Sequence, residues 1–172
     1  MKWLKNLLGR SVTKEKPPLE QEARRQDDFD SSVTGAMFNE GLTRGEAVAK
    51  VTDGANLVDG KQTWEHATEG KHDIELMKRC CEAELETYNK ISDAPAPFYF
   101  WRVAVLSSKQ KDYEQEVDYL QAYVDNLRRS YSRDDMSLED AVTNRVLSAR
   151  TCAIYERLPK AKARLEKHKT KS

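Results

Sequence analysis

The chain has 172 residues, a length that usually forms one domain. Hydrophobic residues make up 38% and charged residues 34% of it, whereas ordinary globular domains have about 45–50% and about 25%; part of the chain is therefore expected to contribute little core. The net charge is zero, but residues 1–16 carry five basic and one acidic side chain and residues 160–172 carry six and one, which leaves the middle at −9. Composition predicts a helical protein with an acidic body and basic ends.

The three cysteines are Cys80, Cys81 and Cys152, an odd number of which two are adjacent. Neighbouring cysteines rarely bond to each other, so the pattern favours a reducing compartment. The longest apolar run near the N-terminus is Leu7-Leu8, which is too short for a signal-peptide core or a membrane span. We therefore expect a cytoplasmic location, with peripheral contact to the inner face of a membrane as an option.

Residues 1–10 have the pattern of a short amphipathic helix. One of its sides would hold Trp3, Leu4, Leu7 and Leu8. This pattern is typical of a helix that lies in a membrane interface, and the alternative is a helix that docks on the domain or on a partner protein. Residues 11–32 are polar and charged, with Pro17-Pro18, and predict a flexible linker.

A helical domain is expected over residues 33–158. Thr43 and Glu46 have the spacing of a capping box, which predicts a helix over 44–51. Its inward residues would be Ala47, Val48 and Val51.

Asp59-Gly60 predicts a small β-hairpin, because this pair suits the positive backbone angles of a tight turn. The flanking segments would be Leu57-Val58 and Thr63-Trp64.

The first long helix is predicted over residues 71–91, where apolar residues recur at spacings of three and four. They are Ile74, Met77, Cys81, Leu85 and Tyr88. Cys81 is therefore expected in the core, with Cys80 beside this stripe. Pro95 and Pro97 would end the helix region.

Two further helices are predicted over residues 98–109 and 112–129, with Asp112 as the cap of the second. Half of the aromatic residues of the chain lie in this stretch. The break between the helices is short, so they are expected to lie antiparallel.

A last helix is predicted over residues 137–158, beginning at Ser137 and interrupted by Pro159. Its apolar stripe would be Leu138, Val142, Val146, Ala149 and Ala153. Residues 159–172 would form a basic tail that continues as a frayed helix.

The stretch over residues 97–130 resembles one unit of the tetratricopeptide repeat. Phe100, Val103 and Ala104 stand at the first three pattern positions, and Leu120 stands where the family has an aromatic residue. The departures from the pattern are Ser107, Glu116 and Arg128. The resemblance implies an all-α stack of antiparallel helical hairpins that presents a groove to a protein partner.

We expect this chain to act as a protein-interaction module, an adaptor or scaffold. The predicted partner-binding residues are Tyr99, Arg102, Tyr119 and Tyr123, because large aromatic residues and Arg are enriched at binding hot spots. The alternative is that these side chains are packed in the core or against a second copy of the chain.

No motif predicts an enzyme, a metal site or a cofactor. His66, His72 and the three cysteines lack metal-ligand spacing, although an active site assembled from scattered residues would not show in such patterns. The basic termini indicate an alternative role at a membrane or on nucleic acid. The acidic body, and the absence of aromatic residues interleaved with the basic ones, argue against nucleic acid.

Overall fold

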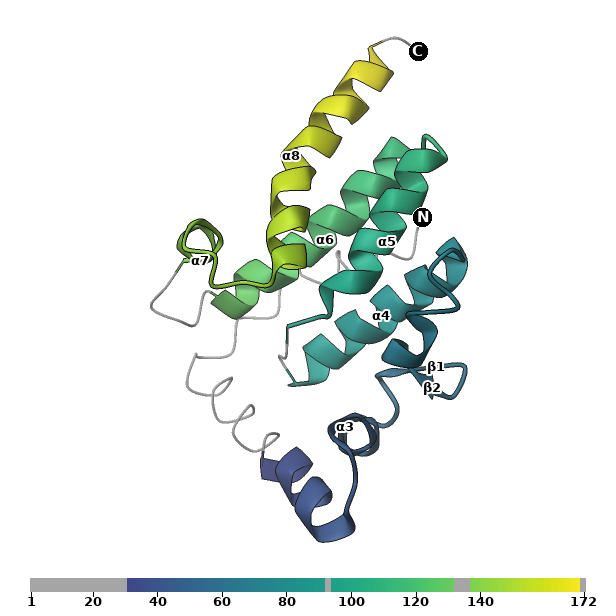
Figure 1. Ribbon diagram of the computed structural model, residues 1–172, viewed down its shortest axis with the longest axis vertical. Coiled ribbons are helices and arrows are strands. Elements are labelled where there is room, and N and C mark those ends of the chain that lie inside the picture. The colour runs from purple at the N-terminus through teal and green to yellow at the C-terminus, as the bar shows by residue number, and fades with distance from the viewer. Residues whose placement is uncertain (1–30, 92–93, 132–136, 171–172) are drawn as a thin grey trace, which may run out of the picture.

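The computed structural model describes residues 31–91, 94–131 and 137–170. The described chain is mostly helical, which confirms the all-α prediction. Helices α5 (Pro97–Lys109) and α6 (Tyr113–Tyr131) pack against each other at the centre. Helix α4 (Ile74–Ile91) lies against α5, and α8 (Ala149–Lys169) lies against α6 and α5 (Figure 1).

Helix α4 begins after Asp73, whose carboxylate accepts from the amides of Glu75 and Leu76 at 3.0 and 3.1 Å. The predicted stripe is buried at Met77, Cys81, Leu85 and Tyr88, whereas Ile74 is half-buried. Cys80 lies fully inside the core and not beside it.

Helix α5 has Pro97 in its first turn, where the missing N–H costs no hydrogen bond. A turn with Lys111 at a positive φ of 62° leads to Asp112, whose carboxylate accepts from the amide of Gln115 at 2.9 Å. The predicted cap is thus confirmed. Phe100 and Tyr123 join the two helices, with ring centroids 5.2 Å apart.

The prediction of one helix over residues 137–158 is wrong. Helix α7 (Leu138–Thr143) ends at Asn144, Arg145 has a positive φ of 54°, and α8 begins after Ser148. The predicted stripe fails here, because Val146 is 61% exposed and Ala149 is also exposed. The buried residues of α8 are Thr151, Ile154, Leu158 and Ala161.

Pro159 does not interrupt α8, which continues to Lys169. Proline in a helix removes one hydrogen bond and crowds the preceding turn. Pro159 is exposed, while Leu158 and Ala161 on either side of it are buried. Packing of these neighbours holds the helix together across the proline.

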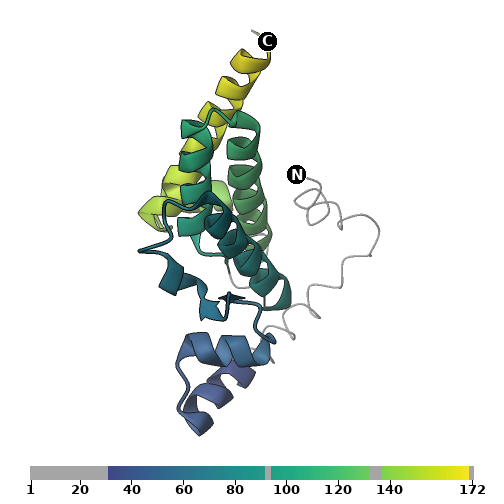
Figure 2. The ribbon, with the colours of Figure 1, turned by 90° about the vertical axis from the view of Figure 1, so that its right-hand side faces the viewer.

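The N-terminal end of the described chain forms a second small core. Residues 31–40 are helical, and α3 (Arg44–Val51) follows with the predicted capping box: the Glu46 carboxylate accepts from the Thr43 amide at 2.8 Å. This pair of helices packs on Ile91 at the end of α4. Val51, expected inward, is 37% exposed. Figure 2 shows this unit at the end of the molecule opposite the C-terminal end of α8.

The Asp59-Gly60 hairpin is present, with β1 (Leu57–Val58) antiparallel to β2 (Lys61–Gln62). Asp59 and Gly60 both have positive φ, as this turn requires. The 3₁₀ helix η1 (Thr63–His66) takes the place of a longer second strand.

The predicted helix over residues 1–10, with Trp3, Leu4, Leu7 and Leu8, lies outside the described residues. So does most of the predicted linker, although the helix over 31–40 already covers its last two residues. Among the described helices, none is long and apolar enough to cross a bilayer.

Candidate binding surfaces on the helical bundle

The tyrosines predicted to contact a partner are part of the core. Tyr99, Tyr119 and Tyr123 are 3%, 6% and 2% exposed. Burial raises the pKa of all three phenols, that of Tyr123 to about 12. The Tyr123 hydroxyl lies 3.0 Å from the Thr151 hydroxyl on α8. A partner protein would have to open the fold to reach these rings.

Arg102, the fourth predicted contact, is half-buried at the edge of α5. Its Nε donates to the carbonyl oxygen of Lys71 at 2.8 Å, and His72 Nδ1 lies 3.4 Å from its Nη2. The side chain therefore ties α5 to the segment that precedes α4, and it is not grouped with the three tyrosines.

A fully buried carboxylate joins α8 to α6. Glu116 accepts from Arg157 Nε and Nη2 at 2.8 and 2.6 Å, and from Arg164 Nη1 at 3.2 Å. Arg164 also donates to the Ser108 hydroxyl at 2.6 Å. Two guanidinium groups thus share one buried carboxylate.

A cleft of about 280 Å³ lies between α6 and α8. We call it the α6–α8 cleft, and its lining consists of Gln121, Val124, Arg128, Tyr155, Leu158, Pro159 and Lys162. The apolar part comes from Val124, Leu158 and Pro159, and two cationic side chains stand among the polar ones. No pattern along the sequence predicts this cleft, because its residues come from two helices that are more than twenty positions apart.

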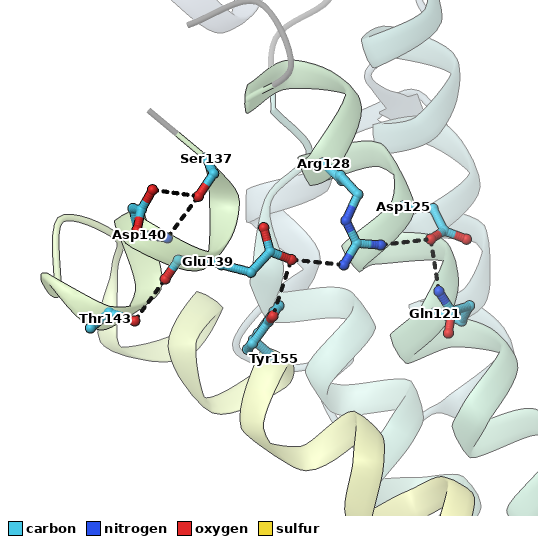
Figure 3. Close-up of polar contacts among 8 residues, drawn as sticks. All are labelled: Gln121, Asp125, Arg128, Ser137, Glu139, Asp140, Thr143 and Tyr155. Atoms are coloured by element: carbon cyan, nitrogen blue, oxygen red, sulfur yellow. Dashed lines mark hydrogen bonds and ion pairs between the residues drawn. The ribbon is translucent and has the colours of Figure 1, made fainter. Parts of the chain in front are cut away.

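A chain of polar contacts connects the cleft to α7 (Figure 3). Gln121 Nε2 donates to Asp125 at 2.7 Å, and Asp125 lies 3.8 Å from Arg128. The second guanidinium nitrogen of Arg128, Nη2, contacts Glu139 on α7 at 3.1 Å. The Tyr155 hydroxyl donates to the same carboxylate at 3.2 Å. Arg128 is therefore fixed between two carboxylates.

The charge states of Glu139 and Tyr155 follow from their contacts. A hydrogen bond from its own backbone and one from Arg128 lower the pKa of Glu139, so that it is a carboxylate at neutral pH. Burial, followed by the negative charge of Glu139, raises the pKa of Tyr155. Tyr155 thus remains a neutral donor.

Two groups of the cleft have unused hydrogen-bonding capacity. Gln121 Oε1 is buried and meets no donor within the described residues. Lys162 is exposed and makes no ion pair with the described residues. A buried acceptor without a donor costs about 1–3 kcal/mol.

Helix α7 carries Glu139, and hydrogen bonds within the helix stabilise its N-terminal end. The Ser137 hydroxyl accepts from the amide of Asp140 at 3.1 Å and donates to the Asp140 carboxylate at 2.7 Å. Thr143 donates to the carbonyl oxygen of Glu139 at 2.8 Å. Glu139 is therefore positioned beside the cleft by a short helix that is capped at its N-terminal end.

The cysteines and histidines are not brought together. Cys80 and Cys81 are fully buried, Cys152 on α8 is half-buried, and burial raises the pKa of Cys80 to about 12. Within the described ranges no three His, Cys, Asp or Glu side chains are arranged to hold a metal ion.

Comparison with known proteins gave no match: neither family models, nor curated proteins, nor solved structures are similar to this chain at a significant level.

Proposed function

We propose that the protein is a helical protein-interaction module, in which α4, α5, α6 and α8 form a tetratricopeptide-like stack. The sequential packing of α4 on α5, α5 on α6 and α6 on α8 supports this proposal. The partner would bind in the α6–α8 cleft and not at the buried tyrosines.

The observation that carries the proposal is the combination of groups in the cleft. The Gln121 amide, whose Oε1 meets no donor among the described residues and must turn toward the cleft to be reached, suits a backbone N–H; the apolar lining suits one aliphatic or aromatic side chain, and Lys162 suits a carboxylate. These three groups occur together in a peptide segment with an acidic residue next to an apolar one. The volume of about 280 Å³ is just below the usual ~300–1,000 Å³ of small-molecule sites, so a side chain fits better than a cofactor.

Arg128 contributes less to recognition than its charge suggests. Asp125 and Glu139 already contact it, so its positive charge is largely matched before a partner arrives. We therefore expect Lys162 to set the preference for an acidic partner and Gln121 to set the alignment of the partner backbone.

The test is selection of peptides from a random display library on the full chain, followed by calorimetry with the selected peptides. Acidic-apolar sequences should bind, and K162E should weaken them at least tenfold. Q121L should weaken them because it removes the acceptor without adding charge. K160E is the matched control, since Lys160 is exposed on the same helix and does not line the cleft.

Equal binding to K162E and K160E would reject the cleft as the binding site. Selected peptides without an acidic residue would reject the proposed partner chemistry.

A further inference from the structure

Three arginines of α8 stand over three aromatic rings. Arg150 lies over Phe98 at 5.2 Å from the ring centroid, Arg157 over Trp101 at 5.1 Å, and Arg164 over Tyr113 at 5.8 Å. The arginines are seven residues apart, which places them on one side of a helix at intervals of about 10.5 Å. We call these six residues the arginine–aromatic ladder.

The ladder remains accessible to solvent. Phe98, Trp101 and Tyr113 are half-buried, Arg150 is exposed, and the side chains of Arg157 and Arg164 keep 21% and 40% of their surface. Each ring therefore keeps part of its surface exposed to solvent.

The ladder carries excess positive charge. Glu116 is the one carboxylate that the described structure places against its arginines, and it is shared by two of them. The neighbouring Lys160 and Lys167 are exposed and make no ion pair with the described residues. The two acidic side chains of α8 lie elsewhere: Glu156 lines a hollow beside α7, and Glu166 lies 3.9 Å from Lys169.

We propose that the ladder binds single-stranded nucleic acid. Such sites combine a cationic track for the phosphates with aromatic or guanidinium planes on which unpaired bases stack. The basic tail over residues 160–172 has no aromatic residues in its sequence, but folding places rings from α5 and α6 against the arginines of α8. This surface is separate from the α6–α8 cleft, so the inference does not rest on the proposed protein partner.

The dimensions define the expected site. Arg150 to Arg164 spans about 21 Å of helix, which is long enough for a short run of unpaired nucleotides. The three arginines and the two lysines, less the charge of Glu116, leave about four positive charges to contact phosphates. The plot of log Kd against log salt concentration should then have a slope of magnitude about 2.8. Affinity should then fall roughly 50-fold between 50 and 200 mM salt.

The experiment measures binding of the full chain to a fluorescein-labelled 12-nucleotide oligo(dT) by anisotropy, at several salt concentrations. A duplex of the same length and vesicles containing an anionic phospholipid serve as competitors. The test variants are K160Q/K167Q, which removes two exposed charges, and W101L, which removes a stacking plane. The charge-matched control is K50Q/K61Q, whose two lysines lie in α3 and β2 at the other end of the molecule.

K160Q/K167Q should reduce the salt slope by about 1.4, whereas the control should leave it unchanged. W101L should weaken oligo(dT) binding about fivefold to 100-fold with a smaller effect on its salt slope. Circular dichroism verifies that each variant is folded, and the lysine pair still tests the proposal if W101L is not.

Three outcomes would overturn the proposal. They are no binding to oligo(dT) at 50 mM salt, equal slopes for the test and control lysine pairs, or a duplex or vesicle that competes as well as unlabelled oligo(dT).

Discussion

Replacing Glu116 by Gln should destabilise the protein more than any other single loss of charge considered in this structure. The carboxylate is fully buried and accepts three hydrogen bonds from two guanidinium groups, at 2.8, 2.6 and 3.2 Å. Removing one partner of a buried ion pair costs about 3–5 kcal/mol. Because Arg157 and Arg164 keep 21% and 40% side-chain exposure, water partly replaces the lost contact, and we expect about 2–4 kcal/mol.

For a chain of this length, that loss corresponds to a decrease in Tm of about 5–15 °C. Urea unfolding followed by circular dichroism measures the free energy directly. The control is E75Q, whose carboxylate is 73% exposed in a surface pair with Lys78; such pairs contribute about 0–1 kcal/mol.

A double-mutant cycle with R157Q separates the ion pair from general packing. If Glu116 and Arg157 interact as the distances indicate, the double variant should lose about 1–3 kcal/mol less than the sum of the single variants. An additive cycle, or an E116Q protein as stable as E75Q, would refute the assignment of Glu116 as the residue that fixes α8.

Three further predictions follow from burial and helix geometry. A thiol reagent should modify only Cys152 rapidly in the native protein and all three cysteines in urea, since Cys80 and Cys81 are fully buried; rapid modification of three thiols would contradict the packing of α4. Burial raises the pKa of Tyr99, Tyr119 and Tyr123 above the ordinary value near 10, so their contribution to stability is complete below pH 10 and is lost as the pH rises towards 12. Absorbance at 295 nm should show these three phenols ionising only with unfolding, and simple titration of all seven tyrosines near pH 10 would disprove this. P159A should stabilise the protein by about 1–3 kcal/mol, because it restores a hydrogen bond inside α8; a less stable variant would show that the proline is accommodated without cost.

Local signals allowed much of the fold to be predicted. The capping box of Thr43 and Glu46, the Asp59-Gly60 turn and the Asp112 cap are each decided within a few residues, and all three are present. The apolar stripe of α4 is also as predicted for most of its length. Such features depend on neighbouring atoms along the chain, so their sequence patterns are informative.

The C-terminal helices were predicted poorly because tertiary contacts decide them. Arg145 adopts a positive φ without any glycine to mark the turn. Ser148 was the available signal, since its hydroxyl accepts from the amide of Thr151 at 3.2 Å and caps α8. Continuation through Pro159 depends on the burial of Leu158 and Ala161, which the sequence of α8 alone does not reveal.

The burial of the three tyrosines predicted as partner contacts has a physical explanation in the composition. With only 38% hydrophobic residues, the chain has few large aliphatic side chains for its core, and Tyr99, Tyr119 and Tyr123 form part of that core. The surface is then left to arginines and half-buried rings. The arginine–aromatic pairs of the ladder join residues about fifty positions apart, so no pattern along the chain predicts them.

Glu116 shows how a buried charge at a helix crossing places a requirement on the next helix. A small Ala at this helix crossing would allow close approach of the next helix, whereas a buried glutamate requires cations from that helix. Arg157 and Arg164 supply them, seven residues apart and thus on one side of α8. The same spacing places Arg150, Arg157 and Arg164 over Phe98, Trp101 and Tyr113. The contact that docks α8 and the surface proposed to bind nucleic acid therefore depend on the same arginines, and E116Q should perturb both.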